Sequence, residues 1–455
     1  MEHQDQELSR SLKNRHVQLI SIGGAIGTGL FLGSGKSIQQ TGPSILLAYL
    51  ITGGICFLIM RALGELLLSN TENHSFLDFV AEYLGKKWAF LTGWTYWFCW
   101  IAIAMADLTA TGLYIRYWFP GIPQWLPEIC ALLILVALNL IAVSLFGELE
   151  FWFALIKVVA ILALIGIGAY MILTHYPTSA GPVKVANIWN HGGWFPKGLK
   201  GFLLSFQMVT FAFVGIELVG LVAGETKDPE KVLPEAINHI PIRIILFYLG
   251  SLFVIMAIYP WNSLGTSQSP FVEVFSEIGI TAAATVINVV VLSAAASACN
   301  SAIYSTGRMI RSLAQEGSAP KPFVKLTKQQ VPANAIFFSA LVIFSAVIMN
   351  YLMPSQVFTI VTSIATTCFL FVWGILTYTH LKYRRSIRGK KTHGFKMPFY
   401  PVSNYLVFAF LLFVAGVLLY TPETRLAALV TPVWFLILRG IYYLKFQRKQ
   451  KGAAD

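Results

Sequence analysis

The sequence predicts an all-α polytopic membrane protein with about twelve transmembrane helices. Of its 455 residues, 56% are apolar and only 12% are charged, and the mean hydropathy is +0.66, far outside the range of soluble domains. Apolar windows of about 18 residues or more, long enough to cross a bilayer, recur along the chain. These windows lie near 17–37, 42–68, 89–117, 127–146, 151–174, 200–224, 241–260, 280–306, 333–352, 357–381, 402–420 and 425–444.

The first span contains the glycine-rich stretch GGAIGTG, from Gly23 to Gly29. Each glycine in a helix interior costs about 1 kcal/mol relative to alanine, so this stretch predicts a broken helix. In a bilayer, broken backbone is found only where it is buried in protein or lines a watery cavity. A half-helix that starts after the break points its N–H groups at the gap, which suits a carboxylate. The alternative is tight helix packing, because Gly23/Gly27 and Ala25/Gly29 are pairs of small residues four apart.

The sixth span is interrupted in a similar way by FAFVGIE, from Phe211 to Glu217. Two interrupted helices in corresponding halves of a chain indicate a transporter binding site. We therefore expect a first repeat at 17–174 and a second, inverted repeat at 200–381. Two additional spans at 402–444 follow, and the polar tails are 1–16 and 445–455.

The basic residues indicate how the chain is oriented. Lys and Arg gather in alternate loops and in both tails, most densely at 382–396, as the positive-inside rule requires; Lys184 and Lys197, in the loop at 175–199, are the exception. This distribution assigns the net charge of +12 to topology and not to nucleic-acid binding. We expect both termini to be cytoplasmic, in the cell membrane. The N-terminus lacks a signal-peptide pattern, and the five cysteines have no paired spacing, so we expect neither disulfides nor zinc.

Lys157 is a cation inside the apolar fifth span. A charge there costs about 2.5–3.5 kcal/mol on insertion scales, so a proton carrier or a fixed counter-charge is the natural interpretation. The alternative is that the side chain extends along the helix to the cytoplasmic interface, which Glu148 and Glu150 would mark.

Glu217 is the matching anion, just after the predicted break in the sixth span, and could take up a proton. It could instead be a structural carboxylate that caps the restarted half-helix. Asp107 in the third span is a third buried candidate whose role is open. Glu65 and Glu225 lie near the cytoplasmic ends of spans, and we interpret them as interfacial, structural or gating residues.

The eighth span carries a polar stripe, and the chain lacks signatures of soluble catalysis. Ser293, Ser297, Asn300 and Ser301 could face Lys157 or the cavity, although membrane helices often bond to one another in this way. There is no phosphate loop with its lysine, no nucleophile elbow and no metal-spaced histidine pattern. We expect a transporter driven by an ion gradient, with no enzyme activity and no cofactor.

The motifs resemble those of the bacterial amino acid transporter family, within the amino acid–polyamine–organocation superfamily. They are GGAIGTGLFLGSG, MRALGELLLSN, EFWFALIKVVAI, FAFVGIELVG with AGETKDPEK, and NSAIYSTGRM. TGWTYWFCW, GGWFPKG and AINHIPIRII are most similar to the branch that takes D-serine, D-alanine and glycine. The resemblance implies a leucine-transporter-type fold, a 5+5 inverted repeat with two extra helices.

The resemblance also implies roles for individual residues. Backbone N–H groups of Gly27, Thr28 and Gly29, with the Thr28 hydroxyl as a further donor, would bind the substrate carboxylate. The carbonyls of Ala25, Phe211 and Val214 would take the ammonium group, and the ring of Phe211 would act as a gate. Gly215 is the remaining expected substrate-binding residue. Lys157 matches a lysine that replaces sodium in proton-coupled relatives.

The resemblance thus implies proton symport of small neutral amino acids: glycine, D-alanine and D-serine, with L-alanine as a further candidate. The alternatives are a permease of this family for other L-amino acids and an amino acid exchanger. The expected partners are the substrate, protons and the lipid bilayer. The oligomeric state and the substrate chirality stay open.

Overall fold

The computed structural model describes residues 26–70, 75–141, 143–178, 181–217, 229–265, 268–277, 279, 281–387 and 394–447. Nearly all of these residues are helical, and the strands among them are the two-residue β1 (Pro177–Thr178) and β2 (Gly181–Pro182), which pair antiparallel. Nine helices in this part of the chain are long and apolar enough to cross a membrane. The predicted all-α membrane class is therefore confirmed.

The first-half helices are α2 (Thr28–Phe31), α3 (Gly33–Thr41), α4 (Ile45–Ser69), α5 (Phe76–Leu84), α6 (Lys86–Arg116), α7 (Trp125–Ile141) and α8 (Val143–Leu173). The later helices are α9 (Gly198–Phe211), α11 (Pro229–Asn238), α12 (Ile240–Arg243), α13 (Ser251–Ile258), α14 (Pro270–Glu277), α15 (Thr281–Gln315), α16 (Ala333–Ile343), α17 (Ser345–Leu352), α18 (Pro354–Ser386), α19 (Val402–Tyr420) and α20 (Pro422–Tyr442). Short 3-10 or π segments are η1 (Gly42–Ser44), η2 (Val185–Ile188), η3 (Ile244–Gly250), η4 (Trp261–Ser263), η5 (Lys321–Val324) and η6 (Tyr443–Gln447).

The difference between nine long apolar helices and about twelve predicted spans has a local cause. The run Gly33–Ser69 holds two predicted spans, α3 and α4, which η1 separates by a tight turn. Two other predicted spans are short helices, α7 with 17 residues and α9 with 14 residues. The predicted breaks lie in two of these spans, the first span, which contains α3, and the sixth span, which contains α9.

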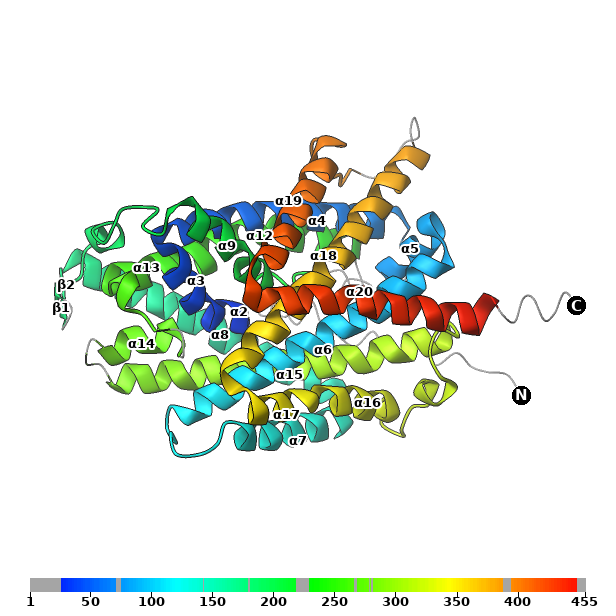
Figure 1. Ribbon diagram of the computed structural model, residues 1–455, viewed down its shortest axis with the longest axis horizontal. Helices are drawn as coiled ribbons and strands as arrows, with labels where there is room; N and C mark the ends of the chain where they lie inside the picture. Colours follow the sequence, from blue (N-terminus) through cyan, green and yellow to red (C-terminus); the bar gives the residue numbers. More distant parts are fainter. Residues whose placement is uncertain are drawn as a thin grey trace, which may run out of the picture.

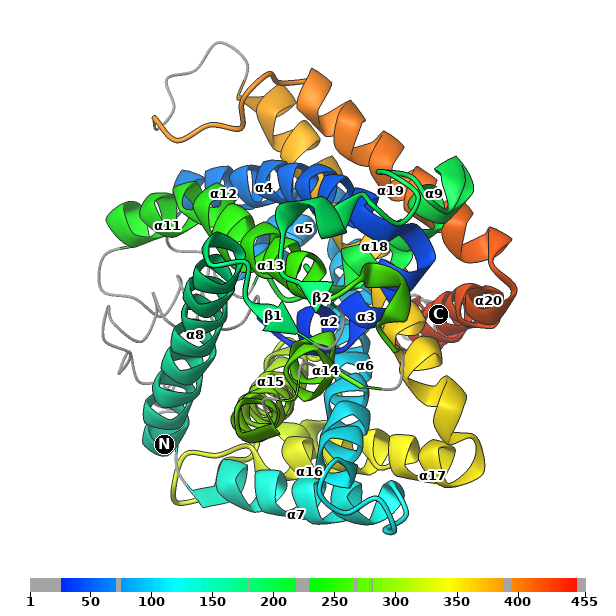
Figure 2. The same cartoon turned by 90° about the vertical axis from the view of Figure 1, so that its left-hand side faces the viewer.

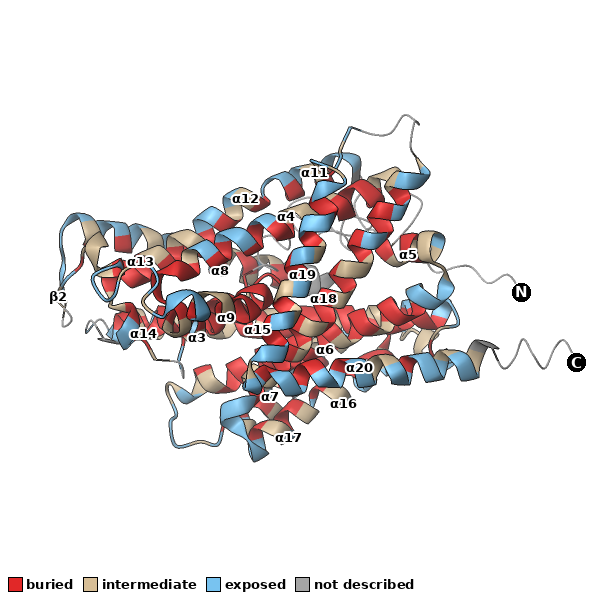
Figure 3. Cartoon of the chain, turned by 45° about the horizontal axis from the view of Figure 1, so that its top comes forward, coloured by how far each residue is buried: buried red, intermediate tan, exposed pale blue. Residues whose placement is uncertain are grey.

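Helices α6 and α15 cross the centre of the bundle and pack along one another (Figures 1 and 2). In α6, 83% of the apolar window is buried, whereas only 17% is buried in the stretch Pro422–Lys445 that contains α20. Figure 3 shows the same contrast, with buried residues along α6 and α15 and many exposed residues along α20. The α20 helix is thus peripheral, and most of its apolar surface faces outward.

The interrupted helices end in the middle of this bundle. Helix α2 begins there and continues through α3 toward the end that holds β1 and β2, and α9 runs back from that end and stops at Phe211 (Figure 1). Helices α3 and α9 lie side by side. Both interruptions therefore lie at the same depth, next to α6 and α15. The division into inverted repeats at 17–174 and 200–381 stays a prediction.

Glu65, interpreted above as an interfacial residue with a structural or gating role, is fully buried within the protein. Its carboxylate lies 2.9 Å from Nε2 of His380 and 3.2 Å from Nη1 of Arg384, both on α18, and accepts a hydrogen bond of 2.7 Å from the backbone N–H of Met397. These contacts fasten α4 to α18 and to the segment after it, so Glu65 has a structural role away from the central cavity. Glu225 lies outside the described residues.

Candidate functional site

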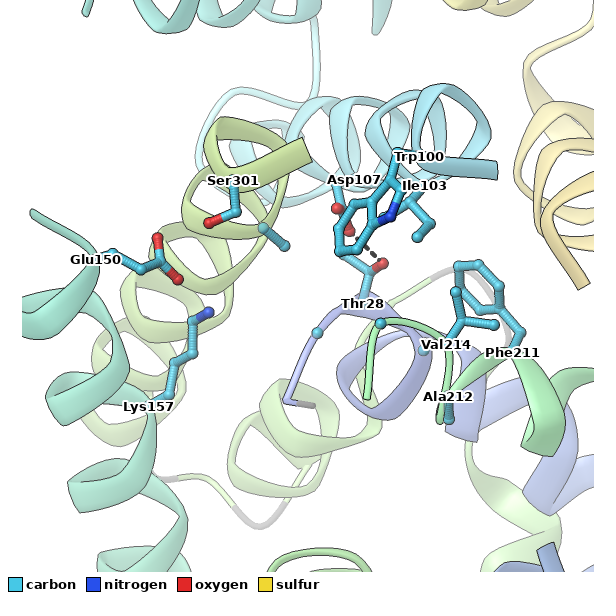
Figure 4. Close-up of a pocket in the computed structure, with 14 residues that line it drawn as sticks. Thr28, Trp100, Ile103, Asp107, Glu150, Lys157, Phe211, Ala212, Val214 and Ser301 are labelled. Atoms are coloured by element: carbon cyan, nitrogen blue, oxygen red, sulfur yellow. Dashed lines mark hydrogen bonds between the residues drawn. The ribbon is translucent and has the colours of Figure 1, made fainter. Parts of the chain in front are cut away.

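A cavity of about 40 Å³ lies where the two interrupted helices meet (Figure 4). Its walls come from α2, α6, α8, α15 and the end of α9. The lining residues are Gly27, Thr28, Gly29, Trp100, Ile103, Asp107, Glu150, Lys157, Phe211, Ala212, Val214, Gly215, Ala298 and Ser301. The structure thus brings the predicted substrate-binding residues that it describes together with Lys157 and Asp107.

The first-span wall is the start of a helix. Gly27 has an extended backbone with φ −127°, and its carbonyl accepts hydrogen bonds from Leu30 N at 3.1 Å and Phe31 N at 3.2 Å. The helix therefore begins at Thr28, as the predicted break requires. The first N–H groups of a helix have no acceptor within the helix, and at this site the first two helical residues, Thr28 and Gly29, line the cavity. Ala25 lies outside the described residues.

The glycines of this stretch do not share one environment. Gly29 packs against the backbone of Ala212 in the sixth span, whereas the Cβ position of Gly27 has open space around it. Gly29 is therefore in close packing with the sixth span, and Gly27, the other described glycine of this stretch, faces the open part of the site.

The sixth-span wall is a helix end followed by turns. Helix α9 stops at Phe211, and the N–H of Val214 then bonds to the Phe211 carbonyl at 3.1 Å in a four-residue turn. Gly215 has φ 92°, a left-handed conformation that side chains with a Cβ rarely adopt. Helix α9 thus ends where the break in the sixth span was predicted, and residues 218–228 lie outside the described part of the chain. The Phe211 ring packs edge-on against Phe358 of α18.

Lys157 is buried, with 1% of its surface exposed. Its Nζ donates to Oγ of Ser297 on α15 at 3.1 Å, and this hydroxyl lies 3.0 Å from both carboxylate oxygens of Glu150, to which it donates. The side chain does not extend to the interface, so the alternative placement of Lys157 is wrong. Figure 4 shows Glu150 and Lys157 pointing toward each other from α8.

Glu150 is a functional candidate that its sequence context does not reveal. The sequence indicates an interface marker, but Glu150 is 1% exposed and lines the cavity. The available signal was its spacing from Lys157, because residues seven apart lie on the same face of a helix. The side chain of Glu148 lies outside the described residues.

Asp107 reaches the cavity from the middle of α6. Its Oδ1 accepts a hydrogen bond of 2.6 Å from the hydroxyl of Thr28, and its Oδ2 is buried with no hydrogen-bond partner among the described residues. The Thr28 hydroxyl was expected to point at a substrate carboxylate. It has a single hydrogen, which Asp107 already receives.

Glu217 is buried behind the cavity and does not line it. Its carboxylate accepts hydrogen bonds from the Tyr96 hydroxyl at 3.3 Å and from Trp373 Nε1 at 3.4 Å. The structure therefore does not bring Glu217 to Lys157, and its predicted role in proton coupling stays a prediction.

The polar stripe of the eighth span has more than one function. Ser297 bonds to Lys157 and Ser301 lines the cavity, as predicted. Asn300 instead accepts a hydrogen bond of 2.8 Å from Asn139 of α7, and Ser293 donates to the Val290 carbonyl of its own helix. The arrangement offers helix N–H donors, a cation and two carboxylates around a small space, which suits a small zwitterion.

Comparisons with known proteins agree with this geometry. A model of the amino acid permease family matches residues 16–452. Amino-acid permease AapA from Bacillus subtilis (strain 168) is 62% identical over 449 residues, which cover 98% of this chain and 97% of that protein. The D-serine/D-alanine/glycine transporter from Escherichia coli (strain K12) is 50% identical over 452 residues, which cover 98% and 96%. The chain is therefore a multi-pass membrane transporter and not an enzyme, and it belongs to the amino acid permease family.

Proposed function

We propose that this protein imports glycine, D-alanine and D-serine, with L-alanine as a further candidate, by proton symport through alternating access. The observation that carries the proposal is the meeting of two interrupted helices at one small cavity whose wall includes the buried Lys157. The 50% identity to a transporter named for D-serine, D-alanine and glycine supports the substrate class. The bulky walls, Trp100, Ile103 and Phe211, also favour small side chains.

The substrate carboxylate binds at the start of α2. Backbone N–H groups of Gly27, Thr28 and Gly29 are its donors, because a helix N-terminus offers both unpaired N–H groups and a positive dipole end. Helix α2 continues into α3, where Leu32 N bonds to Thr28 O at 2.8 Å, so the dipole is that of both segments together.

The substrate ammonium group binds at the backbone carbonyls of the two breaks. These are Phe211 and Val214 at the turn preceding Gly215, together with Ala25. The Phe211 carbonyl already accepts one hydrogen bond from Val214 N, but a carbonyl oxygen has a second lone pair for the ammonium group. The ring of Phe211 forms a gate over the bound substrate.

Lys157 couples transport to protons by alternating between its charged and neutral forms. A buried ammonium group is stable only while anions and hydroxyl groups surround it, and Glu150 and Ser297 supply both. Loss of the proton weakens this contact between α8 and α15 and allows the site to open inward. Glu217, beside the sixth-span break, is the second candidate for proton uptake.

The protein acts in the cell membrane with both termini in the cytoplasm. The dense basic cluster at 382–396, which begins in the last turns of α18, then lies on the cytoplasmic side, as the positive-inside rule requires.

The test is uptake of labelled glycine, D-alanine, D-serine and L-phenylalanine into proteoliposomes, with and without an imposed pH gradient. We expect the first three to accumulate when the outside is acidic, and L-phenylalanine to be excluded. Uptake that needs an internal amino acid and ignores the pH gradient would identify an exchanger. If L-phenylalanine is transported as fast as glycine, the proposed substrate class is wrong, although the family assignment still holds.

A further inference from the structure

The contact between Thr28 and Asp107 joins the predicted carboxylate site to a buried acid. Thr28 is the first residue of α2, and Asp107 lies in the middle of α6. Both line the cavity, both are at least 98% buried, and Figure 4 shows the Thr28 hydroxyl directed at Asp107. The hydrogen bond is 2.6 Å long and ends on Oδ1 of Asp107, whereas Oδ2 has no hydrogen-bond partner among the described residues.

The direction of the hydrogen bond between Thr28 and Asp107 depends on whether Asp107 carries a proton. A hydroxyl group has one hydrogen to donate, and an ionised carboxylate can only accept. While Asp107 is ionised, the Thr28 hydrogen is therefore held by Asp107 and is not available to a ligand. A protonated Asp107 can instead donate to Oγ of Thr28, and the Thr28 hydrogen is then free to point into the cavity.

We propose that Asp107 is a proton-operated switch for substrate binding: its protonation reverses the hydrogen bond and turns the Thr28 hydroxyl toward the substrate carboxylate. The inference rests on the proposed function, because it requires a carboxylate at the start of α2. Protonation also removes the repulsion between Asp107 and that carboxylate, since two close carboxylates do not both stay ionised. One proton binds together with one substrate: it forms an O–H bond on Asp107, and no other covalent bond forms or breaks.

Other titratable groups surround Asp107 on several elements. Lys157 on α8, Cys299 on α15 and Tyr114 on α6 interact with it electrostatically, and Glu150 of α8 lines the same cavity. On α2 the facing group is the Thr28 hydroxyl, which does not titrate. An ionised Asp107 stabilises the Lys157 ammonium group, so a proton on Asp107 makes it easier for Lys157 to release its own. The switch thus links substrate binding to the proposed coupling residue.

The first experiment measures the protons taken up when glycine binds to the purified protein. Calorimetric titrations in two buffers of different ionisation enthalpy report this number directly. For the unaltered protein we expect close to one proton per glycine at alkaline pH, where the glycine Kd rises by about tenfold per pH unit, as linkage of one proton requires. Asp107→Asn should take up no proton, and its Kd should be independent of pH, because the amide donates to Thr28 permanently.

The second experiment uses Thr28, which separates the switch from a structural role. Thr28→Val should weaken glycine binding at acidic pH by about tenfold, the loss of one hydrogen bond to a charged group. At alkaline pH the loss of affinity should be smaller, because the substitution then also removes the hydrogen bond that Thr28 donates to ionised Asp107 in the free protein, and this offsets part of the loss in the complex. Thr28→Ser restores the hydroxyl and should restore binding at acidic pH. These variants answer the question even if Asp107→Asn fails to fold.

Two results would overturn the proposal. One is proton uptake that persists in Asp107→Asn and disappears in Lys157→Ala, which would assign the proton to Lys157. The other is a Thr28→Val variant that loses the same affinity at every pH. An unaltered protein that binds none of glycine, D-alanine and D-serine would instead count against the proposed function.

Discussion

Gly29 of the first span lies directly against Ala212 of the sixth span. A Cβ atom placed on Gly29 would be 2.6 Å from Cα of Ala212 and 3.1 Å from its Cβ, which is closer than packed atoms approach. Gly27, two residues earlier, has no atom within 4 Å of its Cβ position. One glycine therefore holds the two interrupted helices together, and the other leaves room in the site.

Gly29→Ala should destabilise the protein as well as reduce transport. The added methyl group has to push the backbone of Ala212 away, and overpacking of this kind costs about 1–3 kcal/mol. The measurement is the thermal unfolding midpoint in detergent, with Gly27→Ala as the matched control. If Gly29→Ala has the same thermal unfolding midpoint as the unaltered protein, the prediction is wrong, and the first and sixth spans can move apart without loss of stability.

Gly27→Ala should fold normally but bind substrate poorly. Its methyl group meets no protein atom, and the extended backbone at this position suits any residue. The methyl group projects into the cavity and takes up space that the substrate needs. Overpacking therefore weakens substrate binding, and we expect about a tenfold or greater increase in the glycine Kd. Equilibrium binding of labelled glycine tests this, and an unchanged Kd would place the substrate away from Gly27.

Lys157→Ala should lower stability, and a second substitution should restore much of it. Removing the ammonium group leaves Glu150 buried without its cation, which costs about 3–5 kcal/mol when one partner of a buried pair is lost. In Lys157→Ala/Glu150→Gln the uncharged amide can still accept the Ser297 hydrogen. We expect a higher unfolding midpoint for the double variant than for Lys157→Ala. Equal midpoints would mean that Glu150 does not depend on Lys157.

The same double variant tests proton coupling without the complication of instability. Uptake against a concentration gradient, driven by an acidic exterior, should be lost because no group at this position changes charge. Exchange of labelled for unlabelled glycine should survive in part, because the substrate contacts on the first and sixth spans remain. If the variant still accumulates glycine with the original pH dependence, Lys157 is structural, and proton binding at Asp107 or Glu217 is sufficient for coupling without it.

Amino acid methyl esters should compete poorly with glycine uptake. The N–H groups at the start of α2 attract a full negative charge through the helix dipole, and an ester offers none. Inhibition of labelled glycine uptake by glycine methyl ester, compared with D-alanine as the free acid, measures this. If the ester inhibits uptake as strongly as the free acid, the substrate carboxylate does not bind at the N-terminus of α2.

The sequence by itself determined the class of protein and the position of both interruptions. Long apolar windows fix a membrane protein, because few other structures use so many consecutive apolar residues. Helix propensity fixed the weak points, since the backbone around Gly27 and Gly215 does not favour a helix whatever surrounds it. Lys157 was also visible, because a lysine deep in an apolar span needs a partner wherever the neighbouring helices lie.

Only the tertiary structure decided which residues contact the buried charged side chains. Glu150 looked interfacial because burial depends on the helices packed around it, and α15 brings Ser297 between Glu150 and Lys157. Glu217 looked like a partner for Lys157, but aromatic donors of α6 and α18 hold it outside the cavity. Side-chain contacts across a bundle depend on the rotation and depth of each helix, and these are set by packing of the whole chain and not by any one segment.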